Sequence, residues 1–364
     1  MTFSVYAPDM TMIGLVESVL SVLWIRRFRE PGEFSMQVPF SDAMNEMLRV
    51  GNLLMQSGSP EAMEITFKSL QKDANDMDTI NVRGKTLMQW FDRRVIVKKI
   101  DTDTLSALQI LQRMIRENVT EPTAGSRKIA SMQLLEREDE SPEAMDYESG
   151  DYAGLLDAVT DLLSSSQLGC RITTDPAAGV HSIDFVSPVD KTASSACPCI
   201  FSVDFGSLGE QTYTHSTEQY KNMAYVEGSG GLLAEVGSDK ADAERREVYV
   251  SATDIAAKST SAADKQKALK KLQQRGREEL AASYPVEQTF DGDAETHTAS
   301  LVYGVDYDLG DRVTCQYRRW GIRVDTVISE IQETYEDGVR RVSVFFGEGT
   351  PVISRAMKAL TKRS

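Results

Sequence analysis

Residues 31–40 read Pro-Gly-Glu-Phe-Ser-Met-Gln-Val-Pro-Phe, and this stretch decides the class of fold. Every second residue from Phe34 to Phe40 is apolar, and a polar residue or a proline stands between each pair. A period of two is typical of a β-strand with one buried face. The Pro31-Gly32 pair in front of it predicts a turn, so we expect a half-buried strand that begins directly after that turn.

Segments on both sides of this stretch also have the composition of strands. Residues 19–28 are a predicted partner strand upstream, and the β-branched segments 80–84 and 95–100 predict two more strands downstream. Residues 1–100 are therefore expected to form a small β-barrel or sandwich.

Helical periodicity follows this β region. Apolar residues recur at helical spacing over 105–119, after a possible N-cap at Asp103 or Thr104. A second amphipathic helix is predicted over 152–168, and Gly169 is placed to end it. Residues 136–151 lie between the two with eight carboxylates and one arginine, which predicts a solvated loop.

The remainder of the chain is again mostly β in character. Short strands are predicted at 170–174, 181–186 and 199–205. A lysine-rich segment at 261–283 has a thin apolar face and predicts a surface helix. Asp337-Gly338 lies between two alternating segments, which predicts a tight β-hairpin near the end of the chain.

Length and charge exclude several classes of protein. The 364 residues include 55 acidic and 40 basic side chains, which gives a net charge of −15. Such a field repels polyanions, so tight binding of DNA through phosphate contacts is not expected. A chain of this length is too long to fold around one hydrophobic core and is expected to form about two to four domains.

Cysteine usage and the N-terminus bear on the compartment. Cysteines at 170, 197, 199 and 315 are too few and too dispersed for a disulfide framework, so folding in a reducing compartment is expected. The apolar stretch 10–25 is interrupted by Glu17 and has no basic region before it. It predicts neither a signal peptide nor a membrane span, and we expect folding in the cytoplasm without membrane insertion.

Short motifs that could carry catalysis are each better explained by ordinary structure. Ser69 and Lys72 have Ser-x-x-Lys spacing, but companion motifs are absent, so a surface turn or strand end is expected. His181, His215 and His297 match no metal-ligand spacing and are expected to be ordinary polar positions.

Other motifs lead to the same result. Cys197-Pro-Cys199 has the wrong spacing for a redox or zinc motif and predicts two buried cysteines flanking a turn. The glycine-rich segment 228–231 lacks the lysine of a P-loop and predicts a flexible loop. The sequon at Asn118 matters only in a secretory context, which is not expected here.

Carboxylate pairs such as Asp308 with Asp311, or Asp291 with Asp293, could serve a glycosidase only at a defined separation across a sugar. Residues 308–311 instead predict a turn in which Gly310 adopts a positive φ. No catalytic, cofactor-binding or metal-binding residue is assigned, and the chain is expected to be neither an enzyme nor a cofactor protein.

Dispersed short segments form a recognisable pattern from about residue 3 to residue 350. They are 27–34, 36–39, 82–84, Arg93-Arg94, Leu168-Gly169, 200–202, 220–222, 247–250, 303–311 and Phe346-Gly347. In this order they resemble the tail hub, or baseplate hub, proteins of tailed bacteriophages, in particular the siphovirus-type family of virion tail proteins. The hubs of contractile baseplates are similar.

The resemblance implies a mainly β, α+β fold with two tube-protein-like β-barrel domains and smaller α/β insert domains. The first barrel would be residues 1–100, and a helical insert would span 101–185. The second barrel would combine 186–235 with 299–349, and 236–298 would be its insert with a surface helix. Residues 350–364 would form a basic C-terminal tail.

The resemblance also implies a function. Three copies would form a ring with pseudo-six-fold symmetry at the tail tip of a virion, joining a six-fold tail tube or distal tail protein to a three-fold spike or fibre. A tape-measure protein would occupy the channel, and DNA would only pass through. The alternatives are a tail-associated cell-wall hydrolase that uses a carboxylate pair, or a saccharide-binding tail protein that uses Trp90 or Trp320.

Overall fold

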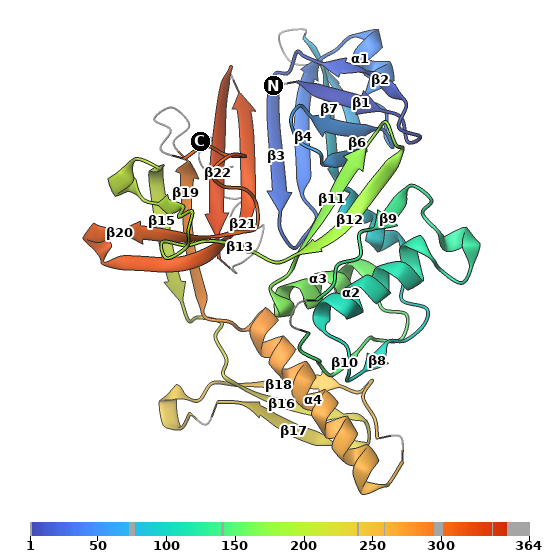
Figure 1. Ribbon diagram of the computed structural model, residues 1–364, viewed down its shortest axis with the longest axis vertical. Helices are drawn as coiled ribbons and strands as arrows, with labels where there is room; N and C mark the ends of the chain where they lie inside the picture. Colours follow the sequence, from blue (N-terminus) through green and yellow to red (C-terminus); the bar gives the residue numbers. More distant parts are fainter. Residues whose placement is uncertain are drawn as a thin grey trace.

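The computed structural model describes residues 2–72, 77–139, 142–238, 240–257, 259–294, 301–336 and 338–347. The structure is 41% strand and 24% helix, which confirms the prediction of a mainly β chain. Four buried hydrophobic clusters divide the structure into four parts, which we name the first β unit, the first insert, the second β unit and the second insert. Figure 1 shows the two β units side by side, with the inserts below them.

The first β unit contains seven strands and one short helix. They are β1 (Phe3–Tyr6), β2 (Met12–Val16), β3 (Ser21–Arg27), β4 (Glu33–Pro39), α1 (Asp42–Met47), β5 (Leu53–Gln56), β6 (Ala62–Lys72) and β7 (Asp78–Thr86). The antiparallel pair β3–β4 confirms the strand predicted at 34–40 and its partner at 19–28. On the buried face the Trp24 ring stacks on Phe34, with ring centroids 5.4 Å apart, because alternate residues of each strand point into the core.

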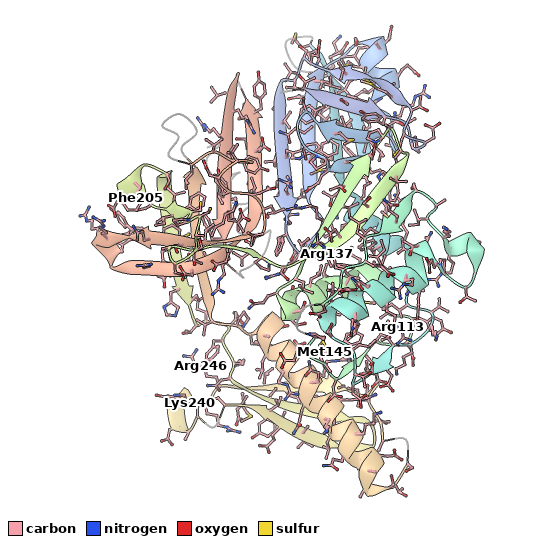
Figure 2. All side chains as sticks on the ribbon, in the orientation of Figure 1. Arg113, Arg137, Met145, Phe205, Lys240 and Arg246 are labelled. Atoms are coloured by element: carbon pink, nitrogen blue, oxygen red, sulfur yellow. The ribbon has the colours of Figure 1, made fainter. Side chains whose placement is uncertain are left out.

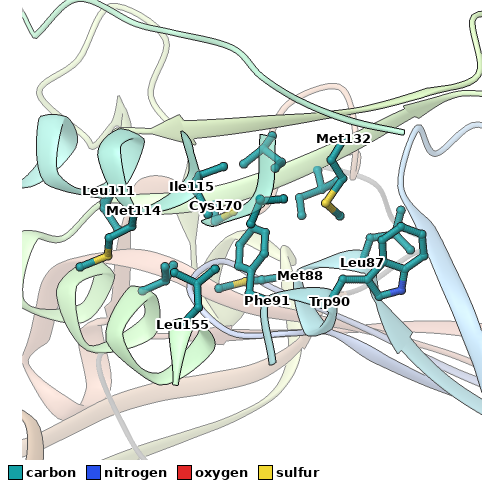
Figure 3. Close-up of a cluster of buried hydrophobic side chains, with 14 of the residues drawn as sticks. Leu87, Met88, Trp90, Phe91, Leu111, Met114, Ile115, Met132, Leu155 and Cys170 are labelled. Carbon is teal, nitrogen blue, oxygen red and sulfur yellow. The ribbon is translucent and has the colours of Figure 1, made fainter. Parts of the chain in front are cut away.

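The first insert packs two helices against a small sheet. Its elements are η1 (Leu87–Arg93), β8 (Asp101–Thr102), α2 (Ala107–Ile115), η2 (Arg116–Thr120), η3 (Gly125–Arg127), β9 (Met132–Leu134), β10 (Tyr147–Glu148), α3 (Leu155–Ser166), β11 (Gly169–Asp175) and β12 (Val180–Val186). Leu111, Met114 and Leu155 from the helices meet Phe91 and Cys170 in the buried cluster of Figure 3.

Two local expectations for this insert are corrected. The predicted strand at 95–100 forms only an isolated bridge between Val95 and Gly154. The first helix begins after Ser106 rather than after Asp103 or Thr104, because Ser106 and Gln109 form a capping box. The second predicted helix is confirmed as α3, but the left-handed Gln167 ends it, and Gly169, which was expected to do so, is the first residue of β11.

The second β unit collects strands from both sides of the second insert. They are β13 (Val189–Lys191), β14 (Ile200–Phe201), β15 (Leu208–Ser216), β19 (Glu287–Ala294), β20 (Asp311–Tyr317), β21 (Ile322–Glu336) and β22 (Val339–Phe346), with short helices η4 (Val203–Phe205) and η7 (Arg318–Trp320). The β21–β22 pair confirms the predicted hairpin, and Gly338 adopts the positive φ that its turn needs. Only the beginning of the predicted strand at 199–205 is a strand, since η4 interrupts it.

The second insert is a three-stranded sheet covered by one long helix. It contains β16 (Met223–Gly228), η5 (Ser229–Gly231), β17 (Leu233–Gly237), η6 (Asp242–Glu244), β18 (Glu247–Ala252) and α4 (Ala262–Ser283), and α4 confirms the predicted surface helix. A Cβ at Gly276 would lie 2.2 Å from the Val236 side chain, so glycine lets the helix approach the sheet closely. Residues 223–235, predicted in the second barrel, belong to the sheet of the second insert, in which β16 pairs with both β17 and β18. Strand β19, predicted in the insert, belongs to the second β unit.

One continuous sheet of 14 strands joins the two β units. Strand β21 pairs antiparallel with β3, with Glu330 opposite Arg27 and Glu336 opposite Ser21. The path runs from β15 through β22, β21, β3 and β4 to β2, and it is open at both ends among the residues that the structure describes. No closed barrel is found in this part of the chain, because β2 and β15 lie at opposite ends of the path and do not pair with each other.

A small ion network joins the two inserts. Lys271 of α4 donates to Asp101 of β8 at 2.8 Å and to Glu148 of β10 at 2.5 Å. Lys99 also pairs with Glu148 at 2.7 Å. Since these groups are only partly exposed, the charges hold α4 against the edge of the first insert. None of the described helices is long and apolar enough to span a bilayer.

His181 generates the first prediction. Its ring is fully buried against Trp90 with ring centroids 5.4 Å apart, and Nδ1 lies 2.9 Å from the Thr174 hydroxyl. Burial lowers the pKa of His181 from 6.5 to about 4. Between these two pH values the unfolded chain binds a proton at this site and the folded chain does not. The free energy of unfolding should therefore fall by up to about 3 kcal/mol as the pH drops through that range.

The variant His181→Gln should lose the part of the pH dependence that comes from this histidine. The carboxylates titrate in the same way in the variant and the wild type, so their contribution cancels when the two free energies of unfolding are subtracted. Urea unfolding at a series of pH values measures the difference. The exposed His215→Gln is the matched control and should follow the wild-type pH dependence. A His181→Gln curve parallel to the wild type would show that this histidine does not set the acid sensitivity.

Candidate functional site

Three of the sequence segments that carried the family resemblance meet at one place in the fold. Residues 27–34 connect the end of β3 to the start of β4, Leu168-Gly169 leads into β11, and 303–311 lead into β20. The first β unit, the first insert and the second β unit all contact one another at this point, which we name the junction (Figure 1). The junction therefore determines how three parts of the chain are placed.

Arg26 lies at the centre of the junction and is 7% exposed. Its Nε donates to Glu61 of the first β unit at 3.0 Å, and its Nη1 donates to Tyr303 at 2.6 Å and to Asp308 at 3.0 Å in the second β unit. Burial alone lowers the pKa of Arg26, but the charge and hydrogen bond of Glu61, together with Tyr303 and Asp308, more than offset this, so the pKa lies well above its ordinary value. One guanidinium thus joins two units while fully charged.

Arg27 makes a parallel set of contacts on the other face of β3. It donates to Glu330 of β21 and to Glu33 of β4, both at 2.7 Å, so it braces the β21–β3–β4 strand order. Its pKa is raised because these two carboxylates outweigh the effect of burial. Nearby, the buried Glu333 of β21 accepts from Gln56 at 3.1 Å and from Arg340 at 2.9 Å. Each of these buried charges has a partner.

Phe28 is wedged between two glycines from different parts of the chain. A Cβ at Gly169 would lie 2.1 Å from the Phe28 ring, and one at Gly310 would lie 2.2 Å from it. Backbone hydrogen bonds hold the wedge in place, since the Phe28 amide donates to Ser329 and the Cys170 amide donates to Phe28, both at 3.0 Å. Glycine is therefore required at both positions for contact with the ring.

This arrangement holds parts of the chain together through ion pairs. Asp308 and Asp311, the carboxylate pair considered for a glycosidase, form ion pairs with Arg26 at 3.0 Å and with Lys191 at 2.8 Å. Gly310 between them has a φ of 87°, which confirms the predicted turn. In the part of the chain that the structure describes, no group of three His, Cys, Asp or Glu side chains could hold a metal ion.

The other sequence candidates are dispersed over the molecule. Ser69 and Lys72 lie on β6 opposite Asn81 and Asp78, and side chains three apart on a strand point to opposite faces. They therefore form no dyad. His181 is a core residue, His215 is exposed on β15, and His297 lies outside the described residues. Asp291 and Asp293 lie on β19.

Cysteine, glycine and sequon candidates also have structural explanations. Cys199 is buried and burial raises its pKa to about 12, whereas Cys197 is exposed, so the expectation that both are buried is wrong for Cys197. The segment 228–231 is a turn between β16 and β17. Asn118 is 1% exposed and donates to the Met114 carbonyl, so it cannot accept a glycan.

The two tryptophans considered for saccharide binding have different environments. Trp90 is 8% exposed and donates to Glu64 at 2.7 Å, so it belongs to the core. Trp320 is 48% exposed at the turn between β20 and β21 and contacts Tyr317 edge-on. The basic tail at 350–364 lies outside the described residues.

Sequence reasoning missed the ion network of the junction. Arg26 and Arg27 lie in the predicted strand at 19–28, and nothing in the sequence linked them to Glu61 or Asp308. The available signal was a pair of adjacent arginines at the end of a strand that is otherwise buried, because buried charges require partners.

Comparison with known proteins identifies similar chains. A family model described as Siphovirus ReqiPepy6 Gp37-like protein matches residues 2–348. The search of curated proteins found no match. Solved structures with similar folds are tail proteins: the 43 kDa tail protein of prophage MuSo2 from Shewanella oneidensis is 11% identical with a TM-score of 0.59, covering 95% of this chain and 98% of that chain.

Two further structures have the same fold. Prophage tail protein gp18 from Listeria monocytogenes EGD-e is 12% identical with a TM-score of 0.57, covering 100% of this chain and 99% of the other. The tail protein from Neisseria meningitidis MC58 is 13% identical with a TM-score of 0.55, covering 95% and 96%. The fold extends over the full length of these proteins at very low sequence identity.

The junction predicts a large loss of stability when Arg26 is replaced. Arg26→Gln leaves Glu61 buried without its cation, so the free energy of unfolding should fall by about 3–5 kcal/mol in urea titrations. Adding Glu61→Gln should recover part of the loss, because no uncompensated charge then remains. Arg49→Gln removes a cation from an exposed pair with Glu46 and should cost less than about 1 kcal/mol. A small effect of Arg26→Gln would contradict this role.

The Phe28 wedge predicts a difference between two glycine substitutions. Gly304 and Gly310 have similar φ values of 82° and 87°, but a Cβ at Gly304 meets no atom within 4 Å. Gly304→Ala should therefore cost only the conformational strain, about 1–2 kcal/mol. Gly310→Ala should cost about 1–3 kcal/mol more through its clash with Phe28, and adding Phe28→Leu should recover part of that excess. Equal losses in denaturant titrations would disprove the wedge.

Proposed function

Because the chain belongs to the Siphovirus ReqiPepy6 Gp37-like family of tail proteins, we propose that it is the hub of a phage tail tip or baseplate. Three copies form a closed ring in this proposal, and each copy contributes two β units. The ring joins a six-fold tail tube or distal tail protein to a three-fold spike or fibre, and it encloses the channel.

The pairing of β21 with β3 carries this proposal. Two hairpins from opposite ends of the chain, β3–β4 and β21–β22, lie next to each other in one sheet. A chain with two β units side by side can occupy two neighbouring positions of a six-fold tube, so three such chains fill all six positions. A spike with three-fold symmetry can bind the same ring without a mismatch.

The open sheet supports assembly with further copies. In the described residues β2 pairs only with β1, and β15 pairs only with β19, so each end of the sheet has an unpaired edge. Exposed Met12, Ile13 and Leu15 lie on β2. Exposed strand edges with apolar side chains favour association. The barrel-like closure that a single chain lacks would be completed by neighbouring copies.

The predicted domain boundaries at residues 100, 185, 235 and 298 are replaced in this proposal by the boundaries of the two β units and two inserts described above. The two β units act as tube-like modules, and the two inserts project from them. The tape-measure protein would lie in the channel, and the negative charge of the chain would keep passing DNA from adhering. A hydrolase is not favoured, because Asp308 and Asp311 are already ion-paired.

Imaging and mass measurement test the proposal. Averaged electron microscopy of the particle should show this chain at the tail tip, with three copies per ring and two β units per copy. Native mass spectrometry of the purified chain at high concentration should show trimers. A location along the tail shaft, a ring of six whole chains, or a chain that never associates would contradict it.

A further inference from the structure

A cluster of arginine and aromatic side chains lies at the outer end of the second β unit. It is formed by Tyr317, Arg318, Arg319, Trp320 and Arg323 at the β20–β21 turn and by Phe205 beside it; we name it the arginine tip. Figure 1 shows the β20–β21 hairpin projecting from the molecule, and Figure 2 places Phe205 at this outer end. The tip is a convex surface far from the junction.

Among the described residues no carboxylate forms an ion pair with the guanidinium groups of the tip, although the backbone amide of Arg318 donates to the Asp204 carboxylate at 3.1 Å. Arg318, Arg319 and Arg323 are exposed, and none forms an ion pair with a residue that the structure describes. Arg318 instead lies over the Phe205 ring at 5.6 Å. Phe205 and Trp320 are 46% and 48% exposed. Arginine and large aromatic residues at an exposed site are the composition of the centre of a protein interface.

A concave surface of opposite charge lies between the β3–β4 turn and α3. This acid groove has a volume of about 460 Å³, and its charged lining consists of the carboxylates Glu30, Glu33, Asp157 and Asp161 and the cations Arg27 and Lys85, so carboxylates outnumber cations by four to two. Glu33 is paired with Arg27, but Glu30, Asp157 and Asp161 form no ion pair in the described structure. Partial desolvation, followed by the charges of Asp157 and Glu279, raises the pKa of Asp161. A cation placed in the groove would relieve this repulsion.

We infer that the arginine tip of one copy binds in the acid groove of the next copy of this chain. This inference rests on the proposed ring. A closed ring of three needs a head-to-tail interface in which two different surfaces of the chain meet. The tip and the groove are such a pair, because one is convex and positive and the other is concave and negative. Planar guanidinium groups also match carboxylates in geometry.

A second copy fits the tip better than DNA does. The chain has a net charge of −15, which opposes the approach of a polyanion as a whole. Each copy has one arginine tip and one acid groove, so a second copy offers unpaired carboxylates at one defined site for each tip. The aromatic members Trp320 and Phe205 also favour a protein partner, since exposed rings gain most from burial at an interface.

Charge reversal in the full chain tests the inference by sedimentation velocity. Arg319→Glu and Asp161→Lys should each weaken trimer formation about tenfold or more. The double variant with both changes should restore it, because every contact then joins opposite charges again. Lys128→Glu is the matched control: it reverses an exposed cation of the first insert and should leave assembly unchanged. Circular dichroism establishes that each variant is folded.

A mixture of the two single variants gives an additional test of ring size. A contact is complementary only when neighbouring copies carry different variants. A ring with an odd number of copies must place two identical variants side by side, so a trimer keeps at least one repulsive contact. Equal mixing should therefore rescue assembly less than the double variant does. Full rescue by mixing indicates an even-numbered ring and overturns the three-membered interface.

The outcomes separate this inference from the proposed function. Trimers that persist in all the variants, or a double variant that stays dissociated, overturn the contact between tip and groove and leave the ring intact. A wild-type chain that remains monomeric at every concentration overturns the ring and the contact together. Binding of a duplex oligonucleotide that Arg319→Glu abolishes, without any change in assembly, would assign the tip to nucleic acid and overturn the inference.

Discussion

The burial of two adjacent arginines at the end of β3 is the constraint on which the rest of the structure depends. A guanidinium removed from water costs several kcal/mol unless carboxylates surround it. The partners of Arg26 and Arg27 come from four places in the chain: Glu61, Glu33, Asp308 and Glu330. The charges are satisfied only when both β units are present in one orientation, so this network specifies how the two halves meet.

Apolar packing and strand pairing favour the same arrangement of the β units and the first insert as the ion network does. Phe28 follows the two arginines directly and fills the space between Gly169 and Gly310, which fixes the distance to the first insert. Glu330 and Arg27 face each other in the β21–β3 pair and also form an ion pair, so backbone register and charge agree. Interactions of three kinds therefore select the same arrangement, as expected of a sequence with one stable fold.

Local features could be predicted from the sequence because their causes are local. The β21–β22 hairpin, the helix α3 and the positive φ of Gly310 each follow from residues within one turn or one helical repeat. The β21–β3 pair could not be predicted, since Arg27 and Glu330 are separated by 303 residues. Alternation of apolar and polar residues predicts a strand but does not indicate which strand it pairs with. Residues 223–235 have the alternation of any half-buried strand, so only the packing of α4 on Val226 and Val236 assigns them to the second insert.

Charges that are paired within the chain distinguish the junction from the arginine tip and the acid groove, the two surfaces that we propose bind a second copy. At the junction the buried charges of Arg26 and Arg27 are matched by carboxylates within the chain. Among the described residues, the arginines of the tip and Glu30, Asp157 and Asp161 of the acid groove form no ion pair. The chain thus has paired charges in its interior and complementary charges at its periphery, and the head-to-tail ring that we propose would bring the peripheral charges of neighbouring copies together.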